Sequence, residues 1–184
     1  MEKFIGISKI WYGNVFSEAV TAAKLKAWLA ANTTTEVKNS HDGTWGYTQD
    51  DPSVTDYINE LTGKPYHRDK VSDGNKTITW TSGAFEFADK ANLQGGSSDA
   101  THWESGKIDF INKAVVAKTK TGNYIVFTNA DIIAKADQQD RAIGLGVTAV
   151  ALENETEGVA DEYWFKGSAI DTTSGGGSGT GGGN

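Results

Sequence analysis

The sequence predicts a mainly β fold, in which two sheets form a sandwich or barrel and one short α-helix flanks it. Period-two alternation is the main evidence, since Ile78 and Trp80 alternate with threonines at 77, 79 and 81, as on a half-buried strand. Three later stretches alternate in nearly the same way and are expected to be long strands: Lys107–Ala117, Asn123–Ala136 and Ala142–Glu153. A change of period inside Gly74–Gly96 predicts the helix.

The second half of Gly74–Gly96 is expected to be a short helix with one apolar stripe. Apolar residues recur there at three- and four-residue spacing, at Ala84, Phe87, Ala88 and Ala91. The pair Gly95-Gly96 ends the helix, because glycine accepts the left-handed conformation found at helix C-termini. The side chains expected to pack this helix on the sheets are Trp80, Phe85, Phe87 and Leu93, with Ile78 beneath them.

The N-terminal part is expected to hold a strand and a second helix. Phe4–Tyr12 is the first strand. Ser17–Ala31 is rich in helix-forming residues and would bury a stripe of Leu25, Trp28 and Leu29. An extended loop that uses the same residues is the alternative.

Three shorter strands complete the predicted sheets. Thr33–Asn39 and Thr44–Thr48 are expected to pair across the turn at 41–43, with Trp45 and Tyr47 on one face. Tyr163–Lys166 is expected to be the last edge strand. The glycines of Gly144-Leu145-Gly146 lie inside a strand and predict a close approach of another backbone.

The stretch Gln49–Asp73 is predicted to be a long loop that leaves the domain. It holds both prolines of the chain and no clean period, and a loop of this length in a compact domain is usually functional. Its apolar residues would be costly on the surface of an isolated monomer, so they are expected to pack on a partner: Val54, Tyr57, Ile58 and Leu61.

The length of 184 residues fits one domain, assigned to residues 1–170. Residues 171–184 are expected to be a flexible tail, because seven of the last ten residues are glycine. The chain has no stretch near the roughly 18 apolar residues of a membrane span. It also lacks the apolar segment and cleavage site of a signal peptide, so synthesis in the cytoplasm is expected.

Composition argues against several classes of function. The chain has no cysteine, which excludes disulfides and thiolate metal sites. A net charge of −7 argues against general nucleic-acid binding, which requires a basic face. The three histidines are not in a zinc-binding spacing, and no G-x-S-x-G element is present. The chain is therefore expected to be no enzyme and to bind no metal or cofactor.

Two alternatives remain from the residues alone. Paired carboxylates such as Asp161-Glu162 are the groups that glycoside hydrolases use. Aromatic residues near polar turns could form the sugar platform of a carbohydrate-binding β-sandwich: Trp45, Tyr47, Trp103 and Trp164.

Three segments together resemble phage tail tube proteins, also called major tail proteins, whose fold is shared with type VI secretion tube proteins. The first is Gly43-Thr44-Trp45 leading into DDPSVTDYINELTGKPY, and the second is KTITWTSGAFEF running into ADKANLQGG. The third is YIVFTNADIIAKADQQDRAIGLGVTAVALE, and the resemblance covers roughly residues 4–167. Ser17–Ala31 fits the family pattern less well.

The resemblance implies a structural virion protein without catalysis, made in the host cytoplasm. It implies rings of six subunits that stack into a tube, with an inner barrel built from all six and a long loop reaching the next ring. Other tail proteins would be partners, and viral DNA would pass through without specific binding. Acidic residues would then line the lumen, pointing away from a core face that carries Phe110, Ile132 and Ile143: Asp109, Asp131 and Asp137.

Overall fold

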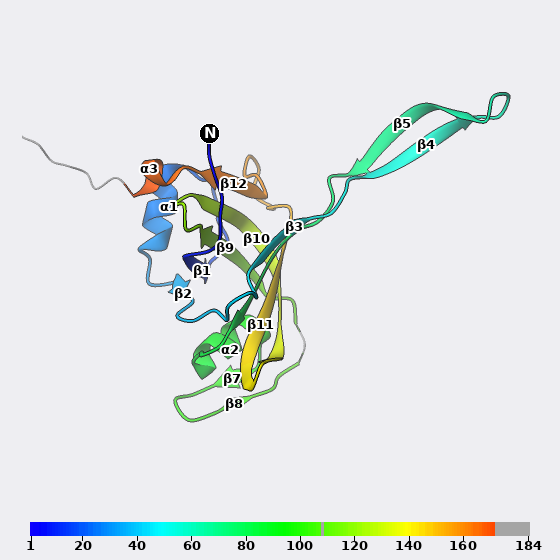
Figure 1. Ribbon diagram of the computed structural model, residues 1–184. Helices are drawn as coiled ribbons and strands as arrows, with labels where there is room; N and C mark the ends of the chain where they lie inside the picture. Colours follow the sequence, from blue (N-terminus) through cyan, green and yellow to red (C-terminus); the bar gives the residue numbers. More distant parts are fainter. Residues whose placement is uncertain (108, 172–184) are drawn as a thin grey trace, which may run out of the picture.

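The computed structural model describes residues 1–107 and 109–171 and is mainly β, as the sequence predicts (Figure 1). The strands are β1 Lys9–Gly13, β2 Thr35–Glu36, β3 Gly46–Gln49, β4 Ser53–Asn59, β5 Lys64–Ser72, β6 Lys76–Ser82, β7 Ser97–Ser98, β8 Trp103–Glu104, β9 Asn112–Lys118, β10 Tyr124–Gln139, β11 Ala142–Ala151 and β12 Glu162–Phe165. The helices are α1 Ala22–Leu29, α2 Phe87–Gln94 and α3 Gly167–Ile170. The predicted tail, apart from Asp171, lies outside the described residues.

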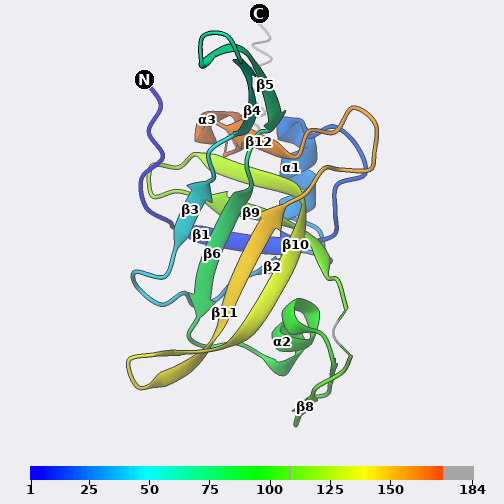
Figure 2. The same cartoon turned by 90° about the vertical axis from the view of Figure 1, so that its right-hand side faces the viewer.

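The long strand β10 joins two layers into one antiparallel sheet of eight strands. The sheet order is β2-β1-β9-β10-β11-β6-β3, and β12 pairs with β10. The first half of β10 pairs with β9 and β12, and the second half pairs with β11 from Ala130 onward. A register shift between Phe127 and Ala130 interrupts the pairing of β10 with β9, which ends at Asp131, and bulges of this kind bend strands. The two expected layers are therefore hydrogen-bonded parts of one folded sheet (Figure 2).

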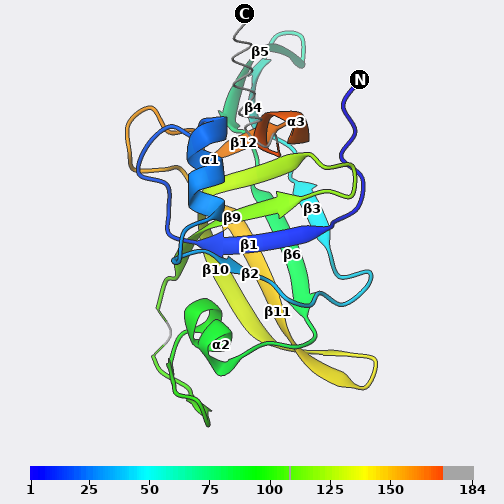
Figure 3. The same ribbon diagram turned by 90° about the vertical axis from the view of Figure 1, so that its left-hand side faces the viewer.

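The main core lies between these two layers. Ile78 and Trp80 of β6 are buried as predicted, and they face buried side chains of β1, β9 and β10, including Phe127. A second cluster lies on the other face of β1, β9 and the first half of β10, where α1 and α3 cover it (Figure 3). Residues 114–117 of β9 are consequently buried on both faces.

The predicted helix at Ser17–Ala31 is present but shorter. Thr21 is the N-cap of α1, because its side-chain oxygen accepts a hydrogen bond of 3.3 Å from the backbone N–H of Lys24. The predicted stripe is confirmed, since Leu25 is buried and Trp28 and Leu29 pack on the second cluster.

The predicted packing of the second helix is wrong at Phe87. The helix α2 begins at Phe87 rather than near Ala84. Glu86 and Asp89 form a capping box that fixes this start. This start turns Leu93 inward, where 2% of its surface is exposed, and leaves 43% of Phe87 exposed. Phe85, which precedes the helix, packs against the core as expected, and Gly95 with φ 81° ends the helix.

Several strand boundaries also differ from the predictions. Strand β1 begins five residues later than expected, at Lys9. Only Thr35–Glu36 of the predicted strand 33–39 pairs, and β3 pairs with β6 instead of with that segment. The strand predicted at 107–117 begins at Asn112, and β10 continues through the predicted turn at 137–140 to end at Gln139. The edge strand β12 is confirmed.

Two residues assigned to the core face are exposed. Phe110 lies in the loop before β9, with 87% of its surface exposed. Ile143 lies on the same face of β11 as the buried Leu145, but the β10–β11 hairpin extends past the end of the core there, and 70% of Ile143 is exposed. Ile132 is buried, as predicted.

Candidate assembly surfaces

A two-stranded arm replaces the loop predicted at Gln49–Asp73. Strands β4 and β5 pair from Ser53–Ser72 to Asn59–Lys64, and the four residues 60–63 form the turn. Two register shifts break the alternation along this hairpin, and Pro65 pairs beside one of them, which is where a sheet tolerates proline. These shifts explain why no clean period marks the segment in the sequence.

The arm, defined here as residues 50–73, continues the β3–β6 ribbon away from the body (Figure 1). The backbone N–H of Asp50 donates to the carbonyl of Asn75, so the two chains stay hydrogen-bonded at the base of the arm. Gly74 has φ 77°, and a Cβ there would overlap the carbonyl oxygen of Asp50. Glycine is therefore required at the base of the arm.

A polar cluster fastens this base to β12. The ammonium of Lys76 lies 2.8 Å from Asp161 and 3.3 Å from Glu162, and the hydroxyl of Tyr47 donates to Glu162 at 2.9 Å. Burial opposes the charge of Lys76, but the hydrogen bond to Asp161 and the charge of Glu162 outweigh it, so the pKa of Lys76 is raised.

The arm exposes its apolar side chains on every side. The four residues predicted to contact a partner are all at least two-fifths exposed, and Leu61 at the tip is 95% exposed. Tyr66 and Val71 add to this set and were missed because they fall at the register shifts. An isolated two-stranded ribbon is only marginally stable in water, and these apolar side chains are exposed in the described part of the chain.

The second candidate surface is the outer face of β3, β6, β11 and the second half of β10, called here the polar face. Its side chains alternate with the core residues, and Ile133 and Val150 are its large apolar members. The others are mostly small or charged: Thr48, Thr77, Thr79, Thr81, Thr148, Asp131, Lys135 and Asp137. Asp131 and Asp137 therefore lie on one face, opposite Ile132, as the alternation predicts. Asp109 does not, because it lies in the loop before β9.

The carboxylate of Asp137 is held in place. The side chain of Gln139 donates to it at 2.7 Å and the hydroxyl of Thr81 donates at 3.0 Å. These two hydrogen bonds lower the pKa of Asp137, so its negative charge persists into mildly acidic solution.

The layer that carries the polar face has an open edge on each side. Strand β3 pairs with β6 on one side, and no described residue pairs with its other side. From Ile133 onward, β10 pairs with β11 alone within the described part of the chain. Open edges present rows of unpaired backbone groups that another strand can join.

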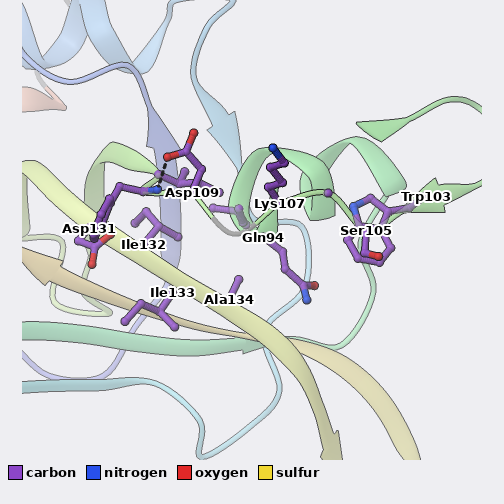
Figure 4. A pocket seen from close by; sticks show the side chains of 13 residues that line it. Gln94, Trp103, Ser105, Lys107, Asp109, Asp131, Ile132, Ile133 and Ala134 are labelled. Carbon is purple, nitrogen blue, oxygen red and sulfur yellow. Dashed lines mark hydrogen bonds between the residues drawn. The ribbon is translucent and has the colours of Figure 1, made fainter. Parts of the chain in front are cut away.

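An apolar groove of about 520 Å³ lies beside the open edge of β10 (Figure 4). Leu93 and Gln94 of α2, Trp103 of β8 and the loop around Phe110 line one side, and β10 supplies Ile132 and Ile133. Asp109 and Asp131 both line this groove, so the structure brings together two of the three predicted lumen residues. No sequence pattern predicts the groove, because its walls are far apart along the chain.

The four aromatic residues of the predicted sugar platform are divided between two ends of the molecule. The ring of Tyr47 lies 5.5 Å from that of Trp164, and Trp45 packs on the main core. Trp103 lies near α2, where its indole donates to the carbonyl of Gly95 at 2.8 Å and Lys90 lies 3.9 Å above its ring.

Within the described residues, no group of three or more His, Asp or Glu side chains is placed to hold a metal ion. None of the described helices has the length and apolarity needed to cross a membrane. No family model and no curated protein matches the chain.

Proposed function

We propose that this chain is the structural subunit of a phage tail tube, a virion protein that assembles into stacked rings of six and guides DNA into the host. The observation that carries the proposal is the four-stranded layer with two open edges and a polar outer face. The role requires no catalytic group, metal or cofactor.

The directions of the strands favour a closed ring. Strands β10, β11, β6 and β3 are successively antiparallel, so β3 of one copy is oriented to pair antiparallel with β10 of the next. Repeating this head-to-tail contact closes a ring when the rotation between copies divides a full turn. A closed ring removes every open edge of the layer, which protects it from irregular association.

The polar face would then line the lumen. Its opposite face is the buried core, so the core side chains cannot face a channel. Threonine hydroxyls make this wall wet, and it is negative because the carboxylates of Asp131 and Asp137 outnumber the ammonium of Lys135. Such a wall does not hold DNA phosphates, and the net charge of −7 per copy adds to this repulsion.

The arm supports stacking of rings. It extends beyond the layer that would form the ring (Figure 2), and its large apolar side chains are exposed in the described part of the chain. Contact with a neighbouring ring would bury them and hold the ribbon in one conformation.

Mass photometry and negative-stain microscopy over a series of protein concentrations test the proposal. The intact protein should form rings and tubes as its concentration rises. A variant with residues 51–73 replaced by an Asn-Gly turn keeps the β3–β6 pairing and should form rings without tubes. A monomer at every concentration and salt condition, also after addition of tail-tip proteins, would refute the proposed function.

A further inference from the structure

The arm and the groove lie at opposite ends of the molecule. In Figures 2 and 3 the arm extends from one end of the β3–β6 ribbon, whereas α2 and β8, which line the groove, lie at the other end. When copies are stacked in one orientation, the arm of each copy points toward the groove end of the next. Two different surfaces that meet in this way form a heterologous contact, which extends indefinitely along an axis.

The chemistry of the two surfaces matches. The outer half of the arm presents three exposed apolar side chains, Ile58, Leu61 and Tyr66. The groove presents the exposed apolar side chains Phe110 and Ile133. Neither set has a covering element within the described residues, so contact between them would remove both from water.

Charged groups flank both surfaces. Glu60 and Lys64 stand on either side of Leu61 in the sequence of the arm tip, and Lys107 and Asp109 stand at the groove. The tip can therefore meet opposite charges at the rim while its apolar residues enter the groove. In addition, the side-chain oxygen of Gln94 is buried at the groove without a hydrogen-bond donor in the described chain, as expected of a surface that a partner covers.

We propose that the outer half of the arm of one copy inserts into the groove between α2, the loop before β9 and β10 of the copy in the next ring. This inference rests on the proposed tube and specifies the contact that joins its rings. It also gives the tube a direction, because one end presents unoccupied arms and the other presents unoccupied grooves.

The β3 strand of a lateral neighbour, which the proposed ring pairs with the open edge of β10, also borders this groove. The side chains of β3 would leave the groove unfilled and open to the arm. Tyr47, the large apolar side chain of β3, packs into the core of its own subunit, and the remaining residues are glycine, threonine and glutamine. A strand of this composition brings no apolar group to fill an apolar groove.

Cysteine cross-linking tests the contact directly, because the chain has no native cysteine. Two double variants place one thiol at the tip and one at the groove: Leu61→Cys with Phe110→Cys, and Leu61→Cys with Ile133→Cys. All three side chains are more than half exposed, so their replacement leaves the core intact. Leu61→Cys with Ile5→Cys is the matched control, because Ile5 is as exposed as Ile133, and Thr48→Cys with Ile133→Cys reports the lateral β3–β10 contact of the proposed ring.

Assembled tubes treated with a short bis-maleimide should give ladders of linked subunits for both tip–groove pairs and none for the Ile5 control. Tubes that form without these ladders, or that link only through Thr48, would overturn the arm–groove contact while leaving the tube itself supported. Absence of any tube from the unmodified protein would instead refute the proposed function on which the contact rests.

A second readout separates the tip from the rest of the arm. Leu61→Asp should shorten or abolish tubes while rings persist, because a carboxylate in an apolar groove is costly. Leu61→Met should restore full-length tubes. Equal tube lengths for the Asp and Met variants would contradict insertion of the tip.

Discussion

Thr81 on β6 donates a hydrogen bond of 3.0 Å to Asp137 on β10, although β11 runs between their two strands. Gly146 of β11 makes this contact possible. It pairs with Thr81, and a Cβ at its position would come within 2.8 Å of the Cβ of Asp137. The absence of a side chain at Gly146 therefore leaves room for a hydrogen bond that links β6 to β10 across β11.

Replacing Gly146 with alanine should displace Asp137 and break its contact with Thr81. We expect a loss of about 1–3 kcal/mol in the free energy of unfolding, as for other insertions into packed positions. Urea denaturation measures this loss. Thr148→Ala, two residues along the same face of β11, is the control and should cost less; equal losses would show that the glycine has no special role.

The two apolar residues of α2 should respond very differently to truncation. Leu93→Ala should cost about 2–5 kcal/mol, because Leu93 is buried against the main core. Phe87→Ala should cost less than about 1 kcal/mol, because Phe87 is a half-exposed residue. Thermal unfolding of both variants checks the orientation of the helix, and the reverse order of stabilities would contradict it.

The base of the arm should depend on Gly74 more than the tip depends on Gly63. Both glycines have positive φ, so alanine introduces backbone strain of about 1–2 kcal/mol at either position. A Cβ at Gly74 also overlaps the backbone of Asp50, whereas a Cβ at Gly63 meets no atom. Gly74→Ala should therefore lower the melting temperature further and shorten the tubes seen by microscopy. Tubes of normal length would show that the direction of the arm does not control stacking.

Charge on the polar face should affect the passage of DNA. Asp131→Lys would place cations along the proposed lumen, where they would attract phosphates and slow ejection from reconstituted particles. Asp140→Lys in the β10–β11 turn changes the net charge equally at the end of the hairpin and is the control. The difference should be largest at low salt, where charge is least screened. Equal ejection rates for both variants would place Asp131 outside the lumen.

Alternation within a strand predicts which of its side chains share a face. Burial of Ile78, Trp80 and Ile132 follows from their period, as does the common face of Asp131 and Asp137. Alternation assigns a face, however, and does not say how far the core extends.

The corrected predictions follow from that limit. Ile143 lies on the correct face of a hairpin that extends past the core. The arm lacks a periodic signal because its two register shifts interrupt the alternation and no core lies beneath it. The contact of Thr81 with Asp137 depends on the register of β6, β11 and β10 relative to one another. Alternation within each strand does not report that register.

A high-resolution cryo-electron microscopy map of the assembled protein tests the central claim most directly. We expect closed rings of six copies in which β3 of each copy pairs with β10 of the next and the polar face lines the channel. Protein that stays monomeric, or rings whose polar face points outward to solvent, would contradict the account.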